Sequence, residues 1–267
     1  MTTMKDNVVA ITGASKGIGA EVARLLAAKG ARLVLAARNE KELEAVAADC
    51  RKAGASVICV RADVARERDC QAIVAGAVLA FGRLDTFVNN AGVSMWARFE
   101  DIEDMSILER IMQVNYMGAV YCTHHALPHL RETRGRIVGV ASLAGMVGVP
   151  TRTGYSASKH AMRGFFDSLR IELDGSGVTV TMIYPGFVST GIRENATGPD
   201  GKPIEISPVK EGEVMGVEAC ARRIVKAIEG REREVIMTAR GKMGLWLKLL
   251  APALIDRIAK RAVERGR

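Results

Sequence analysis

The chain has 267 residues, of which 48% are hydrophobic and 25% are charged, and its formal net charge is +8. A chain of this length and apolar content can bury a large core. It contains no repeat, low-complexity segment or linker, which argues against a disordered, solenoid or multidomain protein. Its five cysteines are odd in number and include no Cys-x-x-Cys pair, which favours a reduced, cytoplasmic protein over a disulfide framework.

The first elements expected along the chain are a strand, a glycine-rich turn, a helix and a second strand. Val8–Ile11 is a short β-branched run that breaks into the glycine-rich residues 12–19. Apolar residues at helical spacing continue to Gly30, and Arg32–Ala36 is predicted to be the second strand. Such a βαβ unit places a pyrophosphate at the helix N-terminus, where glycines let backbone amides approach the phosphate oxygens. The spacing Gly-x-x-x-Gly-x-Gly departs from the common Gly-x-Gly-x-x-Gly, so a glycine-rich turn without a ligand stays open.

Strand and helix signals go on alternating to the end of the chain. The first strand begins within about eight residues, so no signal or transit peptide is expected before it. Later strands are expected at residues 57–60, 84–89, 136–141, 178–184 and 234–237, with long helices at 104–131 and 153–173. This alternation predicts an α/β Rossmann fold, a doubly wound parallel sheet of about seven strands with helices on both faces. We expect residues 1–239 to form this domain and residues 240–267 to form a basic amphipathic extension.

Three polar residues further along the chain suggest acid–base chemistry. Tyr155 and Lys159 are four residues apart, which puts them on one face of a helix. A lysine ammonium beside a phenol favours the phenolate, and this makes the tyrosine a general acid or base for an alcohol or carbonyl oxygen. Ser142, thirteen positions upstream, could polarise the same oxygen. Taken alone, a Tyr-x-x-x-Lys pair is also common on helix surfaces.

Taken together, five motifs resemble the short-chain dehydrogenases/reductases over roughly residues 7 to 238. They are residues 12–19, Asn89–Gly92, Ser142, Tyr155 with Lys159, and Pro185–Gly186, in the order and spacing of that family. The resemblance implies that Tyr155 is the proton donor or acceptor, that Lys159 favours its ionised form and holds the nicotinamide ribose, and that Ser142 orients the substrate oxygen. It also implies that Asn115 joins a proton relay through water. The cofactor contacts expected on the same basis are Gly13, Ser15, Lys16, Gly17, Ile18, Gly19, Arg38, Asp63, Val64, Asn90, Ala91, Gly92, Tyr155, Lys159, Pro185, Gly186, Val188 and Thr190.

The charges after the second strand bear on which nicotinamide cofactor is bound. A site for NAD(H) places an acidic residue at this point to hold the ribose 2′-hydroxyl. This chain has Ala37 at that position, followed by Arg38, and Lys16 lies in the glycine turn. Two cations without a carboxylate suit a 2′-phosphate, so NADP(H) is expected in preference to NAD(H). The resemblance assigns Asp63 and Val64 to the adenine.

Two further groups of residues have competing interpretations. His125 and His129 have metal-ligand spacing, but no carboxylate motif accompanies them, and we expect no metal. The apolar residues that follow residues 89–92 and Ser142 could line a substrate pocket or pack in the core; they are Met95, Trp96, Phe99, Met146, Val147 and Val149. Phe187 and residues 197–208 fall where the family carries a mobile substrate lid.

The segment after residue 239 holds most of the net charge. It has eight basic and two acidic residues, which is +6 of the chain's +8, interleaved with Leu245–Leu247 and other apolar residues. It could lie in a membrane interface, cover a neighbouring subunit or the mouth of the substrate site, or be unstructured. No nucleic acid partner is expected, because no nucleic-acid motif accompanies these charges. The extension and residues 142–145 together resemble the branch with 11β-hydroxysteroid dehydrogenases, which implies steroids, retinoids or other lipophilic carbonyls as substrates.

The leading functional prediction is an NADPH-dependent reductase of a lipophilic ketone or aldehyde, reversible to an alcohol dehydrogenase. A 3-oxoacyl-thioester reductase would use the same catalytic residues. A non-catalytic nucleotide sensor or a peripheral membrane scaffold is the alternative from another class. We expect a homodimer or homotetramer, and a cytoplasmic location with membrane association through the extension as an open alternative.

Overall fold

The structure is a computed structural model that describes residues 3–190, 196–204 and 214–264. Its centre is a seven-stranded parallel sheet with the strand order β3-β2-β1-β4-β5-β6-β7. This order confirms the predicted doubly wound α/β fold. The strands are β1 (Val8–Thr12), β2 (Arg32–Ala37), β3 (Val57–Arg61), β4 (Thr86–Asn89), β5 (Arg136–Val140), β6 (Thr179–Tyr184) and β7 (Glu234–Ile236).

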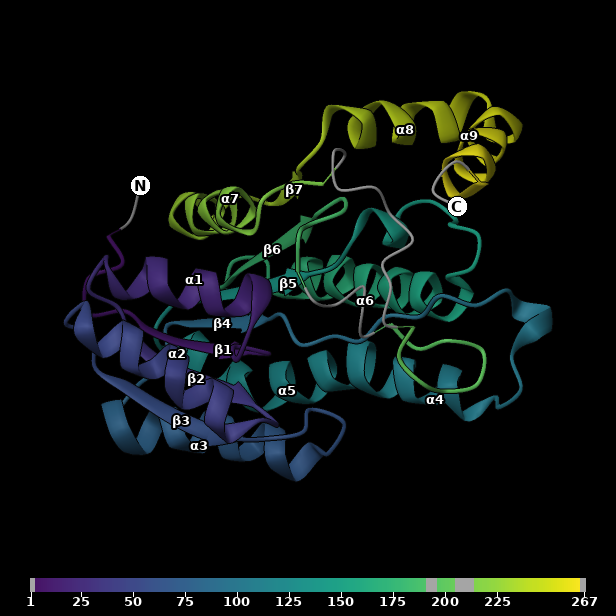
Figure 1. Ribbon diagram of the computed structural model, residues 1–267. Coiled ribbons are helices and arrows are strands. Elements are labelled where there is room, and N and C mark those ends of the chain that lie inside the picture. The colour runs from purple at the N-terminus through teal and green to yellow at the C-terminus, as the bar shows by residue number, and fades with distance from the viewer. Residues whose placement is uncertain (1–2, 191–195, 205–213, 265–267) are drawn as a thin grey trace.

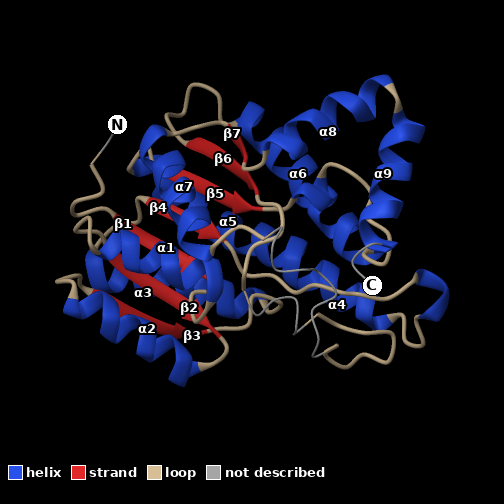
Figure 2. Cartoon of the chain, turned by 45° about the horizontal axis from the view of Figure 1, so that its top comes forward, coloured by secondary structure: helices blue, strands red, loops and turns tan. Residues whose placement is uncertain are grey.

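Helices cover both faces of this sheet (Figures 1 and 2). One face packs against α1 (Gly17–Ala27), α2 (Glu40–Lys52) and α7 (Val217–Gly230). The other packs against α3 (Glu67–Phe81), α5 (Gly118–Glu132) and α6 (Thr153–Glu172). Because both faces of the sheet are covered, both faces of each strand are buried, and the strand sequences are almost continuously apolar. All five residues of β1 and of β5 are buried.

The strand order reverses between β1 and β4, and this determines where a ligand can bind. β1 pairs with β2 on one side and with β4 on the other, and the helix that follows β1 (α1) and the helix that precedes β5 (α5) lie on opposite faces of the sheet. In open parallel sheets, a crevice forms beyond the carboxyl ends of the strands at such a switch point. The glycine-rich turn after β1 and the segment after β4 therefore meet at the same edge.

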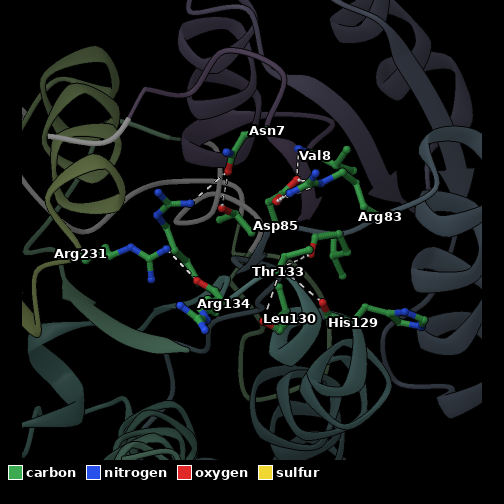
Figure 3. A network of polar contacts seen from close by, with 12 residues as sticks. Asn7, Val8, Arg83, Asp85, His129, Leu130, Thr133, Arg134 and Arg231 are labelled. Carbon is green, nitrogen blue, oxygen red and sulfur yellow. Dashed lines mark hydrogen bonds and ion pairs between the residues drawn. The ribbon is translucent and has the colours of Figure 1, made fainter. Parts of the chain in front are cut away.

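The opposite edge, at the amino ends of the strands, is held by a polar network (Figure 3). The Asp85 carboxylate accepts a hydrogen bond of 2.9 Å from the Val8 amide and pairs with Arg83 at 2.6 Å. Arg231 donates to the Arg134 carbonyl at 2.7 Å and Thr133 Oγ1 donates to the Leu84 carbonyl at 2.8 Å. These bonds satisfy backbone groups where the ladders begin, so they stabilise this edge of the sheet.

Two of the differences between the predicted and the observed elements have a structural cause. The fourth strand starts at Thr86 and not at residue 84, because the Asp85 carboxylate takes the Val8 amide before the ladder begins. The long helix predicted at 104–131 consists of α4 (Ser106–Met112), a π-helical turn at Gln113–Met117, and α5. Wide turns of this kind are frequent at functional sites, and this one contains Asn115.

After β7 the chain forms two more helices, α8 (Ala239–Leu250) and α9 (Pro252–Glu264). Both views show the pair beside α6, on the side of the molecule away from α2 and α3 (Figures 1 and 2). Gly241 of α8 approaches the Leu143 side chain closely, and Lys248 Nζ donates to the Met146 carbonyl at 2.6 Å. The C-terminal helices are thus docked onto the segment that follows Ser142. No described helix is both long and apolar enough to cross a membrane.

Candidate active site

A cavity of about 640 Å³ opens at the carboxyl edge of the sheet. Its wall comes from the turns after β1, β2, β3, β4, β5 and β6 and from the start of α6. Every residue predicted to contact the cofactor, except Gly19, lines this cavity, and so do the predicted catalytic residues Ser142, Tyr155 and Lys159. Segments far apart in the sequence therefore meet around one space that joins the glycine turn to the acid–base residues.

The glycine turn packs too closely against its neighbours to accept a side chain at Gly13 or Gly19. Gly13 has φ of +66°, and a Cβ there would lie 2.9 Å from Ala91 Cα. A Cβ on Gly19 would lie 2.4 Å from the Gly13 carbonyl oxygen, so this residue packs beneath the turn and does not line the cavity. Asn90 Nδ2 donates to the Thr12 carbonyl at 2.9 Å, which ties the turn to the segment after β4. With the N-terminus of α1 next to it, this cradle fits the pyrophosphate of a dinucleotide.

Tyr155 and Lys159 lie in the first turns of α6, on the face towards the cavity. Tyr155 is 7% exposed and Lys159 is 3% exposed. Lys159 Nζ donates to the Val140 carbonyl at 3.0 Å and lies 5.8 Å from the centre of the Tyr155 ring. Burial lowers the pKa of Lys159 from its ordinary value, and the charge of an ionised Tyr155 opposes this shift. Its ammonium is therefore placed to act on the phenol at short range.

Ser142 follows β5 and begins a 3-10 turn at Leu143–Gly145. Its Oγ accepts a hydrogen bond of 3.2 Å from the Ala144 amide, and the Leu143 amide donates to the Pro185 carbonyl at 3.0 Å. The serine is thus held by its own turn and by the segment after β6. Its hydroxyl hydrogen can still be donated towards the cavity, since the recorded bond uses the oxygen as acceptor.

Asn115 does not line the cavity but lies directly behind it. Its Oδ1 accepts from the Val93 amide at 2.8 Å, and its Nδ2 donates to the Val93 carbonyl at 3.0 Å and to Ser158 Oγ at 2.9 Å. The side chain joins the π-helical turn, the segment after β4 and α6. Its geometry supports a role in positioning these three segments.

The far end of the cavity carries charges that suit an adenosine. Lys16 and Arg38 are exposed there, and Ala37 lines the wall. Asp63 pairs with Arg110 of α4 at 2.9 Å. Partial burial opposes it, but the hydrogen bond from Arg110 holds the pKa of Asp63 below its ordinary value. Glu42, in the first turn of α2, also lines this end, a carboxylate that sequence reasoning did not anticipate.

The other end of the cavity contains Arg152, the most notable site residue that sequence reasoning missed. It caps α6 at its N-terminus and lines the cavity, and only 7% of it is exposed. Its guanidinium carbon lies 4.5 Å from the Tyr155 ring centre, and its Nη2 donates a hydrogen bond to Ser94 Oγ. The signal that could have found it is its position three residues before Tyr155, on the same helical face.

The apolar residues that could either line a substrate pocket or pack in the core fall into two groups in the structure. Met95 and Met146 are buried core residues, at 0% and 1% exposure, whereas Phe99 is exposed. Trp96 is half-buried and lies 5.4 Å from the guanidinium carbon of Arg152, and Phe187 lines the cavity. Of the predicted lid at 197–208, residues 205–208 lie outside the described part of the chain. Within 197–204 the chain turns back on itself and pairs with Met95.

The histidines predicted to bind no metal are placed on α5. His125 Nε2 lies 3.4 Å from Glu67 of α3. Among the described residues, no three histidine, cysteine or acidic side chains gather in a cluster that could hold a metal ion.

The fold and this cavity define a dinucleotide-binding oxidoreductase. The chain belongs to the short-chain dehydrogenase family, because the model of that family matches residues 7–200. It is 40% identical to the 11-beta-hydroxysteroid dehydrogenase-like protein 4A of Arabidopsis thaliana, over 95% of this chain and 84% of that protein. It is 38% identical to 11-beta-hydroxysteroid dehydrogenase A of Sesamum indicum, over 93% of this chain and 73% of that protein.

Solved structures give the same result for the fold. A short-chain dehydrogenase/reductase from Burkholderia phymatum in complex with NAD superposes with a TM-score of 0.84, at 27% identity, over 95% of this chain and 96% of that one. An alcohol dehydrogenase from Thermococcus sibiricus complexed with 5-hydroxy-NADP gives 0.75, at 25% identity, over 87% of this chain and 96% of that one. Because the two hold different cofactors, the likeness leaves the cofactor preference of this chain open.

Proposed function

We propose that this protein is an NADP(H)-dependent carbonyl reductase, reversible to an alcohol dehydrogenase, that acts on a ketone or aldehyde with an apolar body. The observation that carries the proposal is the single cavity in which the glycine cradle, Ser142 and Tyr155 face one another. When bound, the nicotinamide supplies or accepts a hydride.

The residues of the chain supply the proton and the polarisation. Tyr155 gives its phenolic proton to the carbonyl oxygen during reduction and takes it back during oxidation. The buried ammonium of Lys159 stabilises the phenolate that this leaves. Ser142 donates a hydrogen bond to the same oxygen and stabilises the negative charge that develops on it. Asn115 keeps the segment after β4 and α6 in register, and its place in a water relay remains part of the proposal.

The preference for NADP(H) rests on the adenosine end of the cavity. Ala37 lines the wall where a carboxylate would hold a ribose 2′-hydroxyl, and Arg38 and Lys16 offer cations for a 2′-phosphate. Asp63 is engaged with Arg110, and in the proposal it contacts the adenine. The carboxylates of the described wall are Asp63 and Glu42, and because Asp63 is paired with Arg110, Glu42 is the one that would oppose a phosphate.

The proposed substrate class is supported by apolar residues near Tyr155 and by the relatives. Phe187 lines the cavity, Val149 packs against the cluster that contains Tyr155, and the curated relatives carry steroid dehydrogenase names. A 3-oxoacyl-thioester reductase stays the second enzymatic candidate, because it would use the same catalytic groups.

The C-terminal helices favour a lipid surface as a further partner. The side chains of Met243, Trp246, Leu249 and Leu250 on α8 are between 65% and 81% exposed. Helix α8 also carries Lys242 and Lys248, and α9 carries Arg257, Lys260 and Arg261, basic residues of the kind found in helices that lie in an anionic membrane interface. We propose a homo-oligomeric, cytoplasmic enzyme that associates with membranes through this pair of helices.

The test is a screen of purified protein against ketones, aldehydes and acetoacetyl thioesters, with NADPH and NADH in parallel. The proposal expects turnover of free ketones, with a higher kcat/KM for NADPH. A higher kcat/KM for the thioester would instead favour a 3-oxoacyl-thioester reductase. Tight NADPH binding without turnover of any carbonyl would favour a nucleotide sensor over an enzyme.

A further inference from the structure

The adenosine end of the cavity contains a carboxylate that a second helix holds in place. Asp63 follows β3 and lines the cavity, and its side chain is 20% exposed. Arg110 of α4 donates from Nη2 to Asp63 Oδ2 at 2.9 Å. Arg110 itself is not among the residues that line the cavity. This arginine is therefore placed to act on a bound cofactor through Asp63.

Both oxygens of the Asp63 carboxylate are anchored. Oδ1 accepts a hydrogen bond from the Ala65 amide at 3.1 Å, while Oδ2 accepts from Arg110. The Asp63 amide donates to Asp69 Oδ2 at 2.9 Å, which fixes the backbone of the same turn. A carboxylate has about four lone-pair sites, so each oxygen can accept one further bond. The directions of these remaining sites are fixed, because the first two bonds hold the plane of the carboxylate.

The Arg110 contact is one of two bonds that join α4 and its π-helical turn to the segment after β3. Gln113, in the π-helical turn, donates from Nε2 to the Ala65 carbonyl at 3.0 Å. Helix α4 also buries Ile111 in the cluster that contains Tyr155. The helix that carries this arginine is therefore packed into the catalytic end of the cavity, and this packing fixes its position relative to the carboxylate.

An anchored carboxylate suits one group of the adenine. Partial burial raises the pKa of Asp63, but its hydrogen bonds and the nearby positive charges outweigh this effect and keep the pKa below its ordinary value. The ionised side chain accepts hydrogen bonds and donates none. Adenine has an amino donor at C6, whereas hypoxanthine has an oxo acceptor at the same position. The carboxylate attracts the first group and repels the second.

We propose that Arg110 is a positioning residue for adenine recognition: it orients the Asp63 carboxylate so that this group accepts a hydrogen bond from the adenine amino group. This inference rests on the proposed function, in which Asp63 contacts the adenine, and adds a residue outside the cavity wall that the contact requires. Arg110 touches neither the cofactor nor the reacting atoms. Without it, the carboxylate can turn away from the base, and selectivity for the amino group is lost.

Binding of two cofactors that differ only at C6 of the purine tests the proposal without turnover. Purified protein is titrated with NADPH and with reduced nicotinamide hypoxanthine dinucleotide phosphate, and the nicotinamide fluorescence is followed. The wild-type protein should bind NADPH at least about tenfold more tightly, which is about 1.4 kcal/mol. In Arg110→Met this preference should fall below about threefold. Arg110→Lys, which keeps the charge and a donor, should keep part of it.

Arg222→Met is the matched control. It removes an arginine that pairs with Glu218 on α7 at 3.7 Å and does not line the cavity. This variant should keep the full preference for NADPH.

A double-mutant cycle shows whether Arg110 acts through Asp63. Asp63→Asn should remove most of the preference on its own, because an amide can donate to an oxo group as well as accept from an amino group. Arg110→Met added to Asp63→Asn should then cause no further loss, since the group that the arginine positions is already gone. Additive losses in the double variant would show that the arginine acts by another route, and would overturn the proposal.

Two other results would overturn it. In one, the wild-type protein binds both cofactors equally well, which leaves the proposed reductase intact. In the other, Arg110→Met weakens both cofactors by the same factor, as a purely structural residue would. A protein that binds neither dinucleotide contradicts the proposed function and the inference that rests on it. If Arg110→Met does not fold, Arg110→Gln, which keeps a neutral donor, takes its place, and a preference equal to the wild-type value would again overturn the proposal.

Discussion

The phenol of Tyr155 is the group on which the proposed chemistry depends most directly. Tyr155→Phe removes the proton donor and keeps the ring that packs against Arg152 and lines the cavity. We expect turnover to fall by about two to four orders of magnitude, with little change in NADPH affinity. Steady-state kinetics and a fluorescence titration measure the two quantities. Tyr121→Phe, on α5 outside the cavity wall, is the control, and a Tyr155→Phe protein that keeps most of its activity would remove this residue from its role.

The ammonium of Lys159 is placed where its charge costs folding free energy. Burial lowers its pKa from the ordinary value of 10.5, so the folded state binds its proton less tightly than the unfolded chain does. The cost is fully present below the lowered pKa and disappears as the pH rises towards 10.5. Lys159→Met removes the cost at every pH. We therefore expect the wild-type protein to gain thermal stability relative to this variant between neutral pH and about pH 10.

Thermal unfolding of both proteins across that pH range is the measurement, and the same preparations should show that the variant has lost turnover. A stability difference that does not change with pH would mean that Lys159 is not desolvated in the folded protein.

Cofactor choice is also decided by single side chains. Arg38→Asp deprives a 2′-phosphate of its partner and places a carboxylate next to it. The preference should move towards NADH by at least about tenfold, or about 1.4 kcal/mol. The measurement is the ratio of kcat/KM for the two cofactors. Lys41→Asp makes the same charge change on α2 outside the main cavity wall, and should leave the ratio unchanged. A wild-type protein that already prefers NADH would refute this interpretation of Ala37, Lys16 and Arg38.

At the residue scale, the sequence predicted correctly the cavity position of residues that belong to a motif. Gly13, Gly17, Asn90 and Pro185 all line the cavity as expected, since their positions follow from backbone requirements close to a strand end. Arg152 and Glu42 could not be assigned in the same way. An arginine or glutamate in a first helical turn is ordinary in any protein, and only the fold shows that these two point at a shared space.

At the scale of elements, the alternation of strands and helices was readable because each strand is buried on both faces. The boundaries and irregularities were not. The π-helical turn at Gln113–Met117 needs the contacts of Asn115 with Val93 and Ser158, which join residues distant in sequence. A local pattern of apolar residues does not depend on such contacts, so the pattern alone predicts one uninterrupted helix.

Aromatic residues in the π-helical turn before α5 and in α6 predict how two copies of the chain assemble. Tyr116 and Phe165 contact each other edge to face, at 6.2 Å between ring centres, and both remain half-buried in the single chain. We expect two copies to pair these helices across a two-fold axis. Phe165→Glu should shift the protein towards the monomer, measured by light scattering after size exclusion. Leu79→Glu places the same charge on an exposed leucine of α3 and should not. A wild-type protein that is monomeric would contradict the prediction.

At the scale of the whole molecule, the C-terminal helices have an inner and an outer face. Leu245 packs against the core, Gly241 lies against Leu143, and Lys248 holds the Met146 carbonyl. Trp246 and Leu249 face outward. The sequence predicted a basic amphipathic segment but not this division, because it depends on where α8 meets the turn after Ser142. The inner face suits a cover for the substrate site, and the outer face suits a membrane.

Deletion of the chain after Met243 removes both faces, and single-face variants separate them. The deletion should leave the dimer and NADPH binding intact, because none of the described residues after Met243 lines the cavity. Trp246→Glu with Leu249→Glu should abolish binding to vesicles that contain phosphatidylglycerol, and leave the turnover of soluble ketones unchanged. Lys248→Ala should weaken the turnover of bulky apolar substrates, since it releases the segment after Ser142, while vesicle binding persists. Vesicles of phosphatidylcholine alone are the control for charge. A truncated protein with full activity on bulky substrates, from a wild type that never binds vesicles, would leave these helices with neither role.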